Sequence, residues 1–419
     1  MISWNLKTRS LQPIGLDIGH DSIKMIQLTV SDGRVSVLAA RKARIDPSTN
    51  GGQEQRRRFA VSTIKQMLAK GGFRGRNVVS SLPNDTLKVT SLRLAEDETG
   101  EIERTLSREA AQRFGLDPDK DAVKYMLAGS VRQGDENKNE LILFAANDQD
   151  IKTHIGMLEE AGLRPVSIDA VPCALFRNSE RLMRRQEDKE RTTIFVDVGG
   201  MFTTVVFGRG GEIRFIKQIP AGAHKFDQKI AEKLDIGAKD AEILRIKLQT
   251  ERVTTSQGEL EASDPDSTAS NNRTSTGQKS EKEDLIDAET RQVMVDAVGS
   301  VAEELAKEIS LCLRYHTVTF RGKRVERAIL TGGGAYEPIL LDVLRRKLQM
   351  EVDVAEPLTE FDVMNMDIDG DRRGLFCDWG VAVGLSLKGC NGSPEGCEPR
   401  PARTRLMEAD TTESILEQL

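Results

Sequence analysis

The stretch IGLDIGHDSIKMIQLTV, residues 14–30, has two apolar runs of β character on either side of a short turn. Such a pattern predicts a β-hairpin, and the turn contains Asp17 and Gly19. A second turn signal, at residues 31–33, predicts that another strand follows. We therefore expect a β-meander that opens a domain.

The same plan returns near the middle of the chain. The segment TTIFVDVGGMFTTVVFGRGGEIRFIKQIPAG, residues 192–222, predicts a strand, an Asp-x-Gly-Gly turn, a second strand, a glycine turn and a third strand. A third glycine-rich turn follows a buried strand in RAILTGGGAYEPIL, residues 327–340, and leads into an amphipathic helix. The chain thus contains a duplicated strand-turn-strand plan and one strand-turn-helix unit.

Each of these turns has residues that suit phosphate binding. Glycine lets the backbone fold tightly and brings its N–H groups close to phosphate oxygens, while a serine adds a hydroxyl and a lysine adds a cation. The candidate cofactor-binding residues of these units are Gly19, Ser22, Lys24, Gly199, Gly200, Gly222, Gly332, Gly333 and Gly334. A single turn of this kind is also explained as an ordinary tight turn, whereas three of them in this order indicate a nucleotide site.

Asp17 and Asp197 end the first strand of their respective hairpins. Mg²⁺ prefers carboxylate ligands together with water and phosphate oxygens. We expect both aspartates to hold hydrated Mg²⁺ and to act as the catalytic carboxylates. The alternative for each is an aspartate that caps a plain hairpin.

Length and composition limit the classes of protein that fit. A chain of 419 residues predicts about two or three packed units. The net charge of −6 excludes the basic excess that nucleic-acid binding requires. The first residues do not form a signal peptide, and no apolar stretch reaches the roughly 18 residues of a transmembrane helix. The five scattered cysteines fit reduced thiols, so we expect a cytoplasmic protein.

On these motifs the chain resembles the superfamily of actin, sugar kinases and DnaK-type ATPases. The hairpins at residues 14–30 and 192–222 are similar to its two phosphate motifs, and residues 327–340 are similar to its adenosine motif. SIDAVPCALFRN, residues 167–178, and WGVAVGLSL, residues 379–387, resemble its two connecting helices. The resemblance implies an α/β fold of two ribonuclease-H-like halves around a cleft for ATP and Mg²⁺.

The resemblance also implies roles for three further residues. Glu242 and Arg245 match positions that hold the ribose and adenine, although the superfamily often has lysine where this chain has arginine. Asp169 is the carboxylate closest to where the superfamily places its attacking water, and a helix cap is the alternative role for it. We expect ATP hydrolysis to be weak.

The place of an inserted segment distinguishes the branches of the superfamily. In this chain the insert lies between the first hairpin and the first connecting helix, an arrangement similar to that of the FtsA and PilM families. The final residues, TTESILEQL, lack the basic amphipathic helix with which FtsA proteins lie on the membrane. The chain therefore resembles the PilM family, with an FtsA-like division protein or a small-molecule kinase as alternatives.

The expected domains follow from the motifs and from composition. Residues 250–284 are mostly small and polar, too poor in apolar side chains to offset the entropy of ordering, so we expect a disordered loop. The expected parts are a first half at 11–44, 161–190 and 372–389, an α+β insert at 45–160, a second half at 191–222 and 318–371, a helical lid subdomain at 223–317 that contains the loop, and a flexible tail at 390–419.

The resemblance implies a scaffold of the type IV pilus, or of the related type II secretion or competence systems. The expected partners are the cytoplasmic N-terminal peptide of PilN and the inner-membrane platform and motor proteins. We expect the chain to reach the inner membrane only through its partner, and we expect no nucleic acid. The alternative class of function is an enzyme proper, an ATPase or a kinase. The presence of a catalytic base would distinguish such an enzyme from a scaffold.

Overall fold

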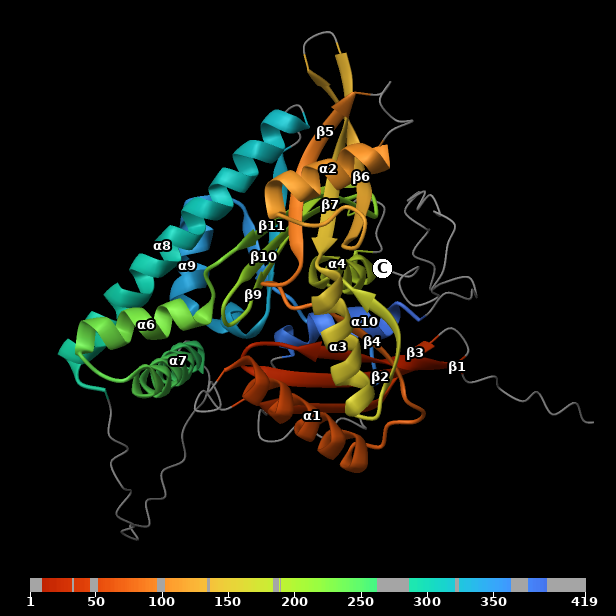
Figure 1. Ribbon diagram of the computed structural model, residues 1–419. Helices are drawn as coiled ribbons and strands as arrows, with labels where there is room; N and C mark the ends of the chain where they lie inside the picture. Colours follow the sequence, from red (N-terminus) through yellow and green to blue (C-terminus); the bar gives the residue numbers. More distant parts are fainter. Residues whose placement is uncertain are drawn as a thin grey trace, which may run out of the picture. The chain divides into compact units, whose positions relative to one another are not determined.

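The computed structural model describes most of the chain, which divides into two compact units (Figure 1). The described residues are 10–31, 34–45, 52–95, 102–133, 136–183, 188, 190–261, 286–320, 324–362 and 376–389. The first unit comprises Met1–Gly222, Glu308–Ala335 and Met350–Leu419, and the second comprises Ala223–Lys307 and Tyr336–Gln349. Each unit is described by itself.

The hairpin expected at residues 14–30 forms the centre of a five-stranded sheet with the order β3-β2-β1-β4-β8. Its strands are β1 (Ser10–Ile18), β2 (Ser22–Ser31), β3 (Arg34–Arg44), β4 (Asn77–Ser81) and β8 (Arg164–Asp169). The first three strands are antiparallel, and β4 and β8 continue the sheet in parallel. The register places Asp17 opposite Lys24 near the end of the hairpin.

A second five-stranded sheet repeats this topology with the order β11-β10-β9-β12-β13. Its strands are β9 (Thr192–Val198), β10 (Thr203–Arg209), β11 (Glu212–Ile219), β12 (Val325–Thr331) and β13 (Glu351–Val354). Three strands are again antiparallel, and two continue in parallel. Asp197 lies opposite Thr204, so the duplication seen in the sequence extends to whole sheets.

Two helices pack between these sheets in the first unit. The expected connecting segments form α4 (Val171–Leu182) and α10 (Gly380–Leu387). Phe176 of α4 packs edge-on against Phe195 of the second sheet, with ring centroids 5.9 Å apart. Helix α10 packs on the first sheet so closely that a Cβ on Gly15 of β1 would overlap the carbonyl oxygen of Ala382. Helix α4 thus contributes to two apolar clusters, one with the second sheet and one with β4 of the first sheet and α10.

The insert is shorter than residues 45–160. It consists of β5 (Lys88–Ala95), α2 (Ile102–Phe114), β6 (Ala122–Gln133) and β7 (Glu136–Ala146), which form a three-stranded sheet with the order β5-β7-β6 and one helix.

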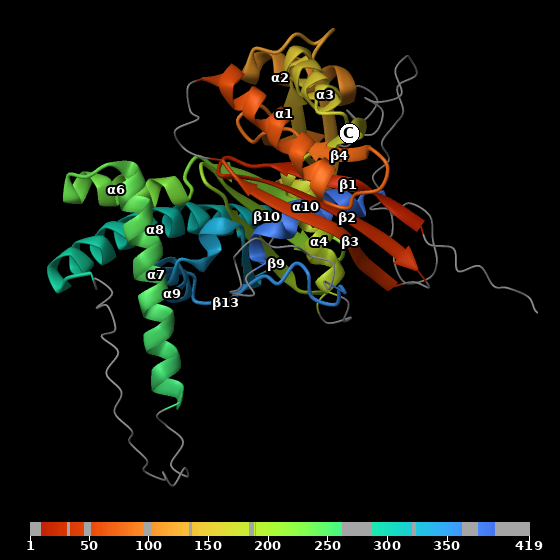
Figure 2. The same ribbon diagram turned by 90° about the horizontal axis from the view of Figure 1, so that it is seen from below.

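The other elements of that range belong to the first sheet. Strand β4 pairs with β1 and β8, and helices α1 (Gln53–Lys70) and α3 (Asp148–Glu160) pack on a face of that sheet (Figure 2). The sheet pairing thus assigns β4 to the first sheet, which the sequence did not indicate, because a short strand such as NVVSS does not encode which sheet it joins.

The second unit is helical. It contains α6 (Ala223–Leu234), α7 (Ala238–Glu261), α9 (Pro338–Leu348) and the first turns of α8 (Ala288–Thr319), whose last turns belong to the first unit. Helix α9 was expected in the second half.

The loop expected at 250–284 is also corrected at its start. Helix α7 continues to Glu261, because residues such as glutamate, glutamine and arginine favour helix even where few apolar side chains are present. Residues 262–284 and the expected tail at 390–419 lie outside the described residues.

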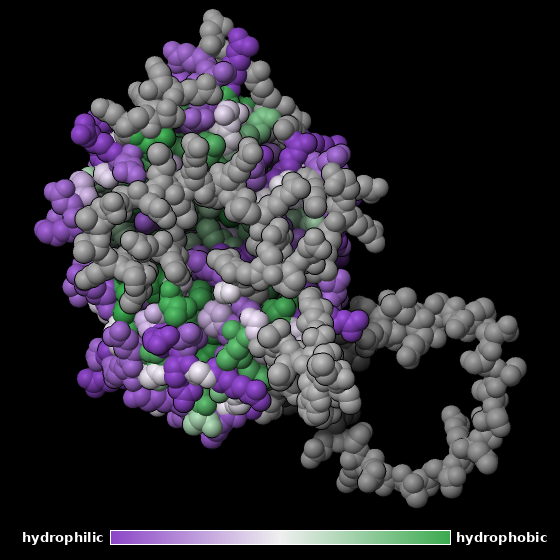
Figure 3. Space-filling model, turned by 90° about the vertical axis from the view of Figure 1, so that its right-hand side faces the viewer, coloured by the Kyte–Doolittle hydropathy of each residue, from purple (hydrophilic) through white to green (hydrophobic). Residues whose placement is uncertain are grey.

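Hydrophilic residues cover much of the face shown in Figure 3, with hydrophobic areas between them. This pattern fits a chain with 30% charged and 38% hydrophobic residues. Among the helices that the structure describes, none is both long enough and apolar enough to cross a membrane.

The packing of α10 can be tested with two helix-interior glycines. A Cβ on Gly384 of α10 would overlap the carbonyl oxygen of Ala174, whereas nothing lies within 4 Å of a Cβ on Gly156 of α3. We expect Gly156→Ala to raise the free energy of unfolding by about 0.5–1 kcal/mol, because alanine favours helix. We expect Gly384→Ala to lower it by about 1–3 kcal/mol through overpacking. Thermal unfolding measures both, and equal shifts would contradict the close contact of α10 with α4.

Candidate functional site

The two hairpins end in turns of the same geometry. Gly19 N donates a hydrogen bond to Ser22 O at 3.0 Å, and Gly199 N donates one to Phe202 O at the same distance. A Cβ on either glycine would lie 3.1 Å from the carbonyl oxygen that its own N–H contacts. Glycine is therefore favoured at this position in both hairpins.

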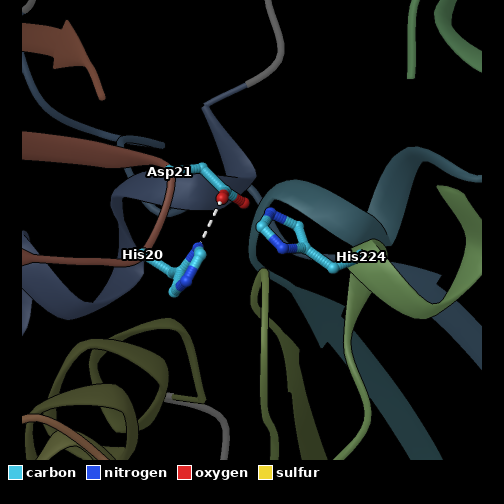
Figure 4. Close-up of side chains that lie close together, drawn as sticks. All are labelled: His20, Asp21 and His224. Atoms are coloured by element: carbon cyan, nitrogen blue, oxygen red, sulfur yellow. Dashed lines mark hydrogen bonds and ion pairs between the residues drawn. The ribbon is translucent and has the colours of Figure 1, made fainter. Parts of the chain in front are cut away.

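The tips of the two hairpins meet. A Cβ on Gly200 would overlap the carboxylate of Asp21, which lies in the turn of the first hairpin. Asp21 Oδ1 is also 3.0 Å from His20 Nδ1 (Figure 4). Gly200 thus lets the turn of the first hairpin approach the turn of the second.

The third glycine turn packs against the second hairpin. Gly332 has a φ of +87°, and a Cβ there would lie 2.6 Å from Asp197 Oδ1. A Cβ on Gly334 would lie 2.5 Å from Val198 Cγ1, whereas nothing lies within 4 Å of one on Gly333. Packing therefore requires glycine at Gly332 and Gly334 but not at Gly333.

Two more of the expected phosphate residues lie beside these turns. A Cβ on Gly222 would overlap the carbonyl oxygens of Gly199 and Gly200, so Gly222 packs directly on the second turn. Ser22 is buried at the first residue of β2. The structure thus brings the glycine, serine and lysine candidates of the first unit to the ends of the two hairpins.

A buried cluster of charges lies at the end of the first hairpin. Lys24 Nζ is 3.3 Å from Asp17 Oδ2 and 3.7 Å from Asp378 Oδ2. Lys42 Nζ is 2.7 Å from the same oxygen of Asp378. Burial alone would lower the pKa of Lys24, but the charges of Asp17 and Asp378 outweigh burial and raise it, so this lysine is cationic.

The surroundings of Asp197 disfavour its ionised form. Part of the residue is exposed, yet the protein removes most of the water around its carboxylate. Burial, and after it the charge of Asp17, raise the pKa of Asp197 to about 7, although the charge of Lys24 opposes the shift. The ionised form of Asp197 therefore lacks sufficient positive charge around it.

Sequence reasoning missed Asp378. It lies in the short 3₁₀ helix η4 (Cys377–Trp379), which is tied to the third glycine turn by two hydrogen bonds. Gly332 N donates to Cys377 O at 3.0 Å, and Cys377 Sγ donates to Gly332 O at 3.1 Å. The only signal was an acid directly before WGVAVGLSL, a position that also suits an ordinary helix cap.

Asp169 has partners that suit a structural role. Its carboxylate is 2.9 Å from Arg177 Nη2 and 3.6 Å from Lys388 Nζ, and it accepts a hydrogen bond from Ala170 N at 2.8 Å. Burial would raise the pKa of Asp169, but the charges of Arg177 and Lys388 outweigh burial and lower it. A carboxylate held in this way is a weak proton acceptor.

Glu242 and Arg245, expected at the ribose and adenine, lie in α7 of the second unit. Arg245 is buried there and donates to Asp227 with Nε at 2.6 Å and Nη2 at 3.2 Å. Its Nη1 is also 3.6 Å from the buried carboxylate of Glu337. Arg245 thus joins α6, α7 and the start of α9, and its role toward adenine stays a prediction.

The charge cluster fits a divalent cation. Asp17 and Asp197 lie at the ends of paired hairpins. The raised pKa of Asp197 reflects burial first and the charge of Asp17 second, and a bound cation would favour the ionised carboxylate against both. Oxygen ligands that retain water are the usual environment of Mg²⁺. The residues present therefore fit the expected metal, with Asp378 as a third carboxylate nearby.

The raised pKa of Asp197 predicts a pH-dependent stability. The folded protein binds this proton more tightly than the unfolded chain, so the stability it gives is complete below about pH 4 and is lost as the pH rises through about 7. We expect Asp197→Asn to have a higher melting temperature than the unsubstituted protein at about pH 8, and to differ little at about pH 4. Melting without nucleotide measures this difference.

The control is Asp342→Asn, because the side chain of Asp342 is 69% exposed. It should melt like the unsubstituted protein across the same pH range. A lower melting temperature for Asp197→Asn at every pH would contradict the unfavourable potential at Asp197.

Comparison with solved structures shows the fold. A chain of the PilM-PilN type IV pilus biogenesis complex is 18% identical, with 91% of this chain and 99% of that chain covered and a TM-score of 0.67. The ethanolamine utilization protein EutJ from Carboxydothermus hydrogenoformans is 13% identical over 90% of this chain and 89% of its own, with a TM-score of 0.49. MreB5 of Spiroplasma citri bound to ADP is 12% identical over 90% and 98%, with a TM-score of 0.41. The expected actin-like α/β fold is confirmed.

The sequence itself identifies the family. The family described as type IV pilus assembly protein PilM matches residues 15–254, which is more than half of the chain. The match includes both phosphate hairpins, the insert and the first connecting helix. It confirms the resemblance to this branch of the superfamily. The chain belongs to the PilM family of type IV pilus assembly proteins.

Proposed function

We propose that this chain is an ATP-binding scaffold of type IV pilus assembly that holds the cytoplasmic N-terminal peptide of PilN. The observation that carries the nucleotide part is the meeting of two hairpin turns of equal geometry beside a cluster of buried carboxylates. Backbone N–H groups in glycine turns bind phosphate oxygens, and paired turns suit a chain of phosphates. The proposed nucleotide is ATP with Mg²⁺.

The residues of the hairpins have distinct roles in this proposal. Asp17 and Asp197 hold Mg²⁺ through water, and the bound ion would offset the negative charge of the phosphates. Lys24 supplies a fixed cation at the end of the first hairpin. Gly200 and Gly332 keep the three turns close together, because any side chain there would overlap a neighbouring carboxylate.

Asp169 favours a scaffold over an enzyme proper. It is the candidate base from the sequence, but its ion pairs with Arg177 and Lys388 lower its pKa and hold its carboxylate. Weak ATP hydrolysis fits a protein in which nucleotide stabilises one conformation. A partner that prefers this conformation would in turn bind better with ATP present, by the same factor.

The partner follows from the family and from the fold shared with a chain of the PilM-PilN complex. An extended peptide can be held by hydrogen bonds to sheet edges and by pockets for alternate side chains. The insert adds a three-stranded sheet with two edge strands, β5 and β6. In this proposal the protein lies in the cytoplasm, and PilN holds it at the inner membrane.

The nucleotide site can be tested with Asp17→Ala and Asp197→Ala. We expect each to weaken Mg²⁺-ATP binding by about tenfold or more, because each removes a carboxylate that faces the ion. Calorimetric titration measures the affinity, and circular dichroism checks folding. Asp342→Ala is the control, since its side chain is exposed on α9, and it should bind like the unsubstituted protein. Unchanged affinity in both aspartate variants would place the nucleotide elsewhere.

The partner can be tested with a synthetic peptide of the PilN N-terminus. We expect it to bind the purified chain more tightly with Mg²⁺-ATP than without nucleotide, because the two ligands share one conformational equilibrium. In cells, we expect the protein to move from the membrane to the soluble fraction when PilN is deleted. Membrane association that persists without PilN, together with no peptide binding in ATP, would refute the scaffold proposal.

A further inference from the structure

Helix α1 touches the first phosphate turn through one arginine. Arg56 Nη2 donates hydrogen bonds to Gly19 O at 3.0 Å and to His20 O at 3.1 Å. Arg56 lies in the first turn of α1, far from residues 19 and 20 in the sequence. One guanidinium therefore binds two consecutive carbonyl oxygens of the turn.

The remaining carbonyl oxygens of this turn also face donors. Ser22 O accepts a hydrogen bond from Gly19 N at 3.0 Å, and Asp21 O accepts one from Ile45 N at 2.8 Å. All four carbonyl oxygens of residues 19–22 are thus engaged by protein groups. Two of the four depend on Arg56.

In the turn of the second hairpin, the equivalent carbonyl oxygens are held by backbone packing. By the matching geometry of the turns, Gly199 and Gly200 correspond to Gly19 and His20. Their carbonyl oxygens pack against Gly222, where a Cβ would overlap both of them. The same pair of carbonyls is therefore fixed in both turns, by a side chain in one and by close backbone packing in the other.

The neighbours of Arg56 show that its contact is specific. Arg57 pairs with Glu160 of α3, and Arg58 Nε is 3.0 Å from Glu54 Oε1 one turn earlier in α1. The side chain of Arg58 is 77% exposed. Three consecutive arginines thus have different partners, and Arg56 is the one that reaches the turn.

Carbonyl orientation matters because a peptide group is a dipole. Its oxygen repels a phosphate oxygen, whereas its N–H end attracts one. Rotation of a peptide plane in a flexible glycine turn would exchange the two ends. A cationic donor that binds the carbonyls on one side opposes this rotation.

We propose that Arg56 is a positioning residue of the nucleotide site. It fixes the Gly19–His20 and His20–Asp21 peptide groups so that the N–H groups of His20 and Asp21 serve the phosphates. This inference rests on the proposed function, because the anion is taken to be nucleotide phosphate. Arg56 acts through the backbone of the turn and makes no contact with nucleotide in this proposal.

The test compares Arg56→Met with Arg58→Met, which change the first and the last of three consecutive arginines in α1. Calorimetric titrations use ADP, ATP and adenosine, all with Mg²⁺. We expect Arg56→Met to weaken ADP and ATP binding by about tenfold and adenosine binding by less than about twofold, because adenosine has no phosphate. Arg58→Met should bind all three like the unsubstituted protein.

Salt separates positioning from simple charge attraction. If Arg56 acted only through its charge on distant phosphates, the loss of affinity would shrink as salt rises from about 0.05 M to about 0.5 M. If Arg56 orients the turn, the loss of affinity persists at high salt. We expect the affinity loss of Arg56→Met to remain at high salt and Arg56→Lys to recover part of it.

Three outcomes are informative. If the unsubstituted protein binds no nucleotide, the proposed function fails. If it binds ADP and Arg56→Met binds ADP equally well, whatever its melting temperature, the positioning role is refuted while the proposed function stands. A loss of affinity that disappears at high salt, or that is equal for adenosine and ADP, would also refute positioning.

Discussion

The ion pairs of Lys24 with Asp17 and Asp378 constrain all three glycine turns. A buried lysine must be paired, because breaking a buried ion pair costs about 3–5 kcal/mol. One partner, Asp17, comes from the opposite strand of the same hairpin. The other, Asp378, depends on η4, which is hydrogen-bonded to Gly332. Gly332 in turn packs on Asp197 of the second hairpin, so the charge cluster requires the convergence of both sheets.

The sequence indicated the strands, the glycine turns and two aspartates of this arrangement, but not which of these parts contact each other. Glycine and aspartate at strand ends have local signatures, so Asp17, Asp197 and the three turns could be found from spacing alone. Asp378 could not, because its importance comes from contacts with Lys24 and Lys42, more than three hundred residues earlier in the chain. Strand β4 was placed in the insert for a similar reason: its pairing with β1 is a property of the folded sheet.

Arg245 has contacts that the motif did not predict. Its role toward adenine stays a prediction, and in the second unit its guanidinium binds Asp227 of α6 and lies near Glu337 at the start of α9. Arginine presents several donors in a planar fork, so it can join three helices in a way that lysine cannot. The departure from the usual lysine at this position thus has a structural explanation within the unit.

The two hairpins share a backbone geometry but differ in the residue that lies across from the aspartate. At the position across from Asp17 the first hairpin has Lys24, whereas the second has the neutral Thr204 across from Asp197. Asp17 therefore has a counter-ion within its own hairpin, and Asp197 feels the charge of Lys24 only from the neighbouring sheet. The two hairpins together thus contain the carboxylates of Asp17 and Asp197 and one cation, Lys24. A cationic ligand would reduce the net negative charge of this pair, and any ligand that binds the folded chain would stabilise it.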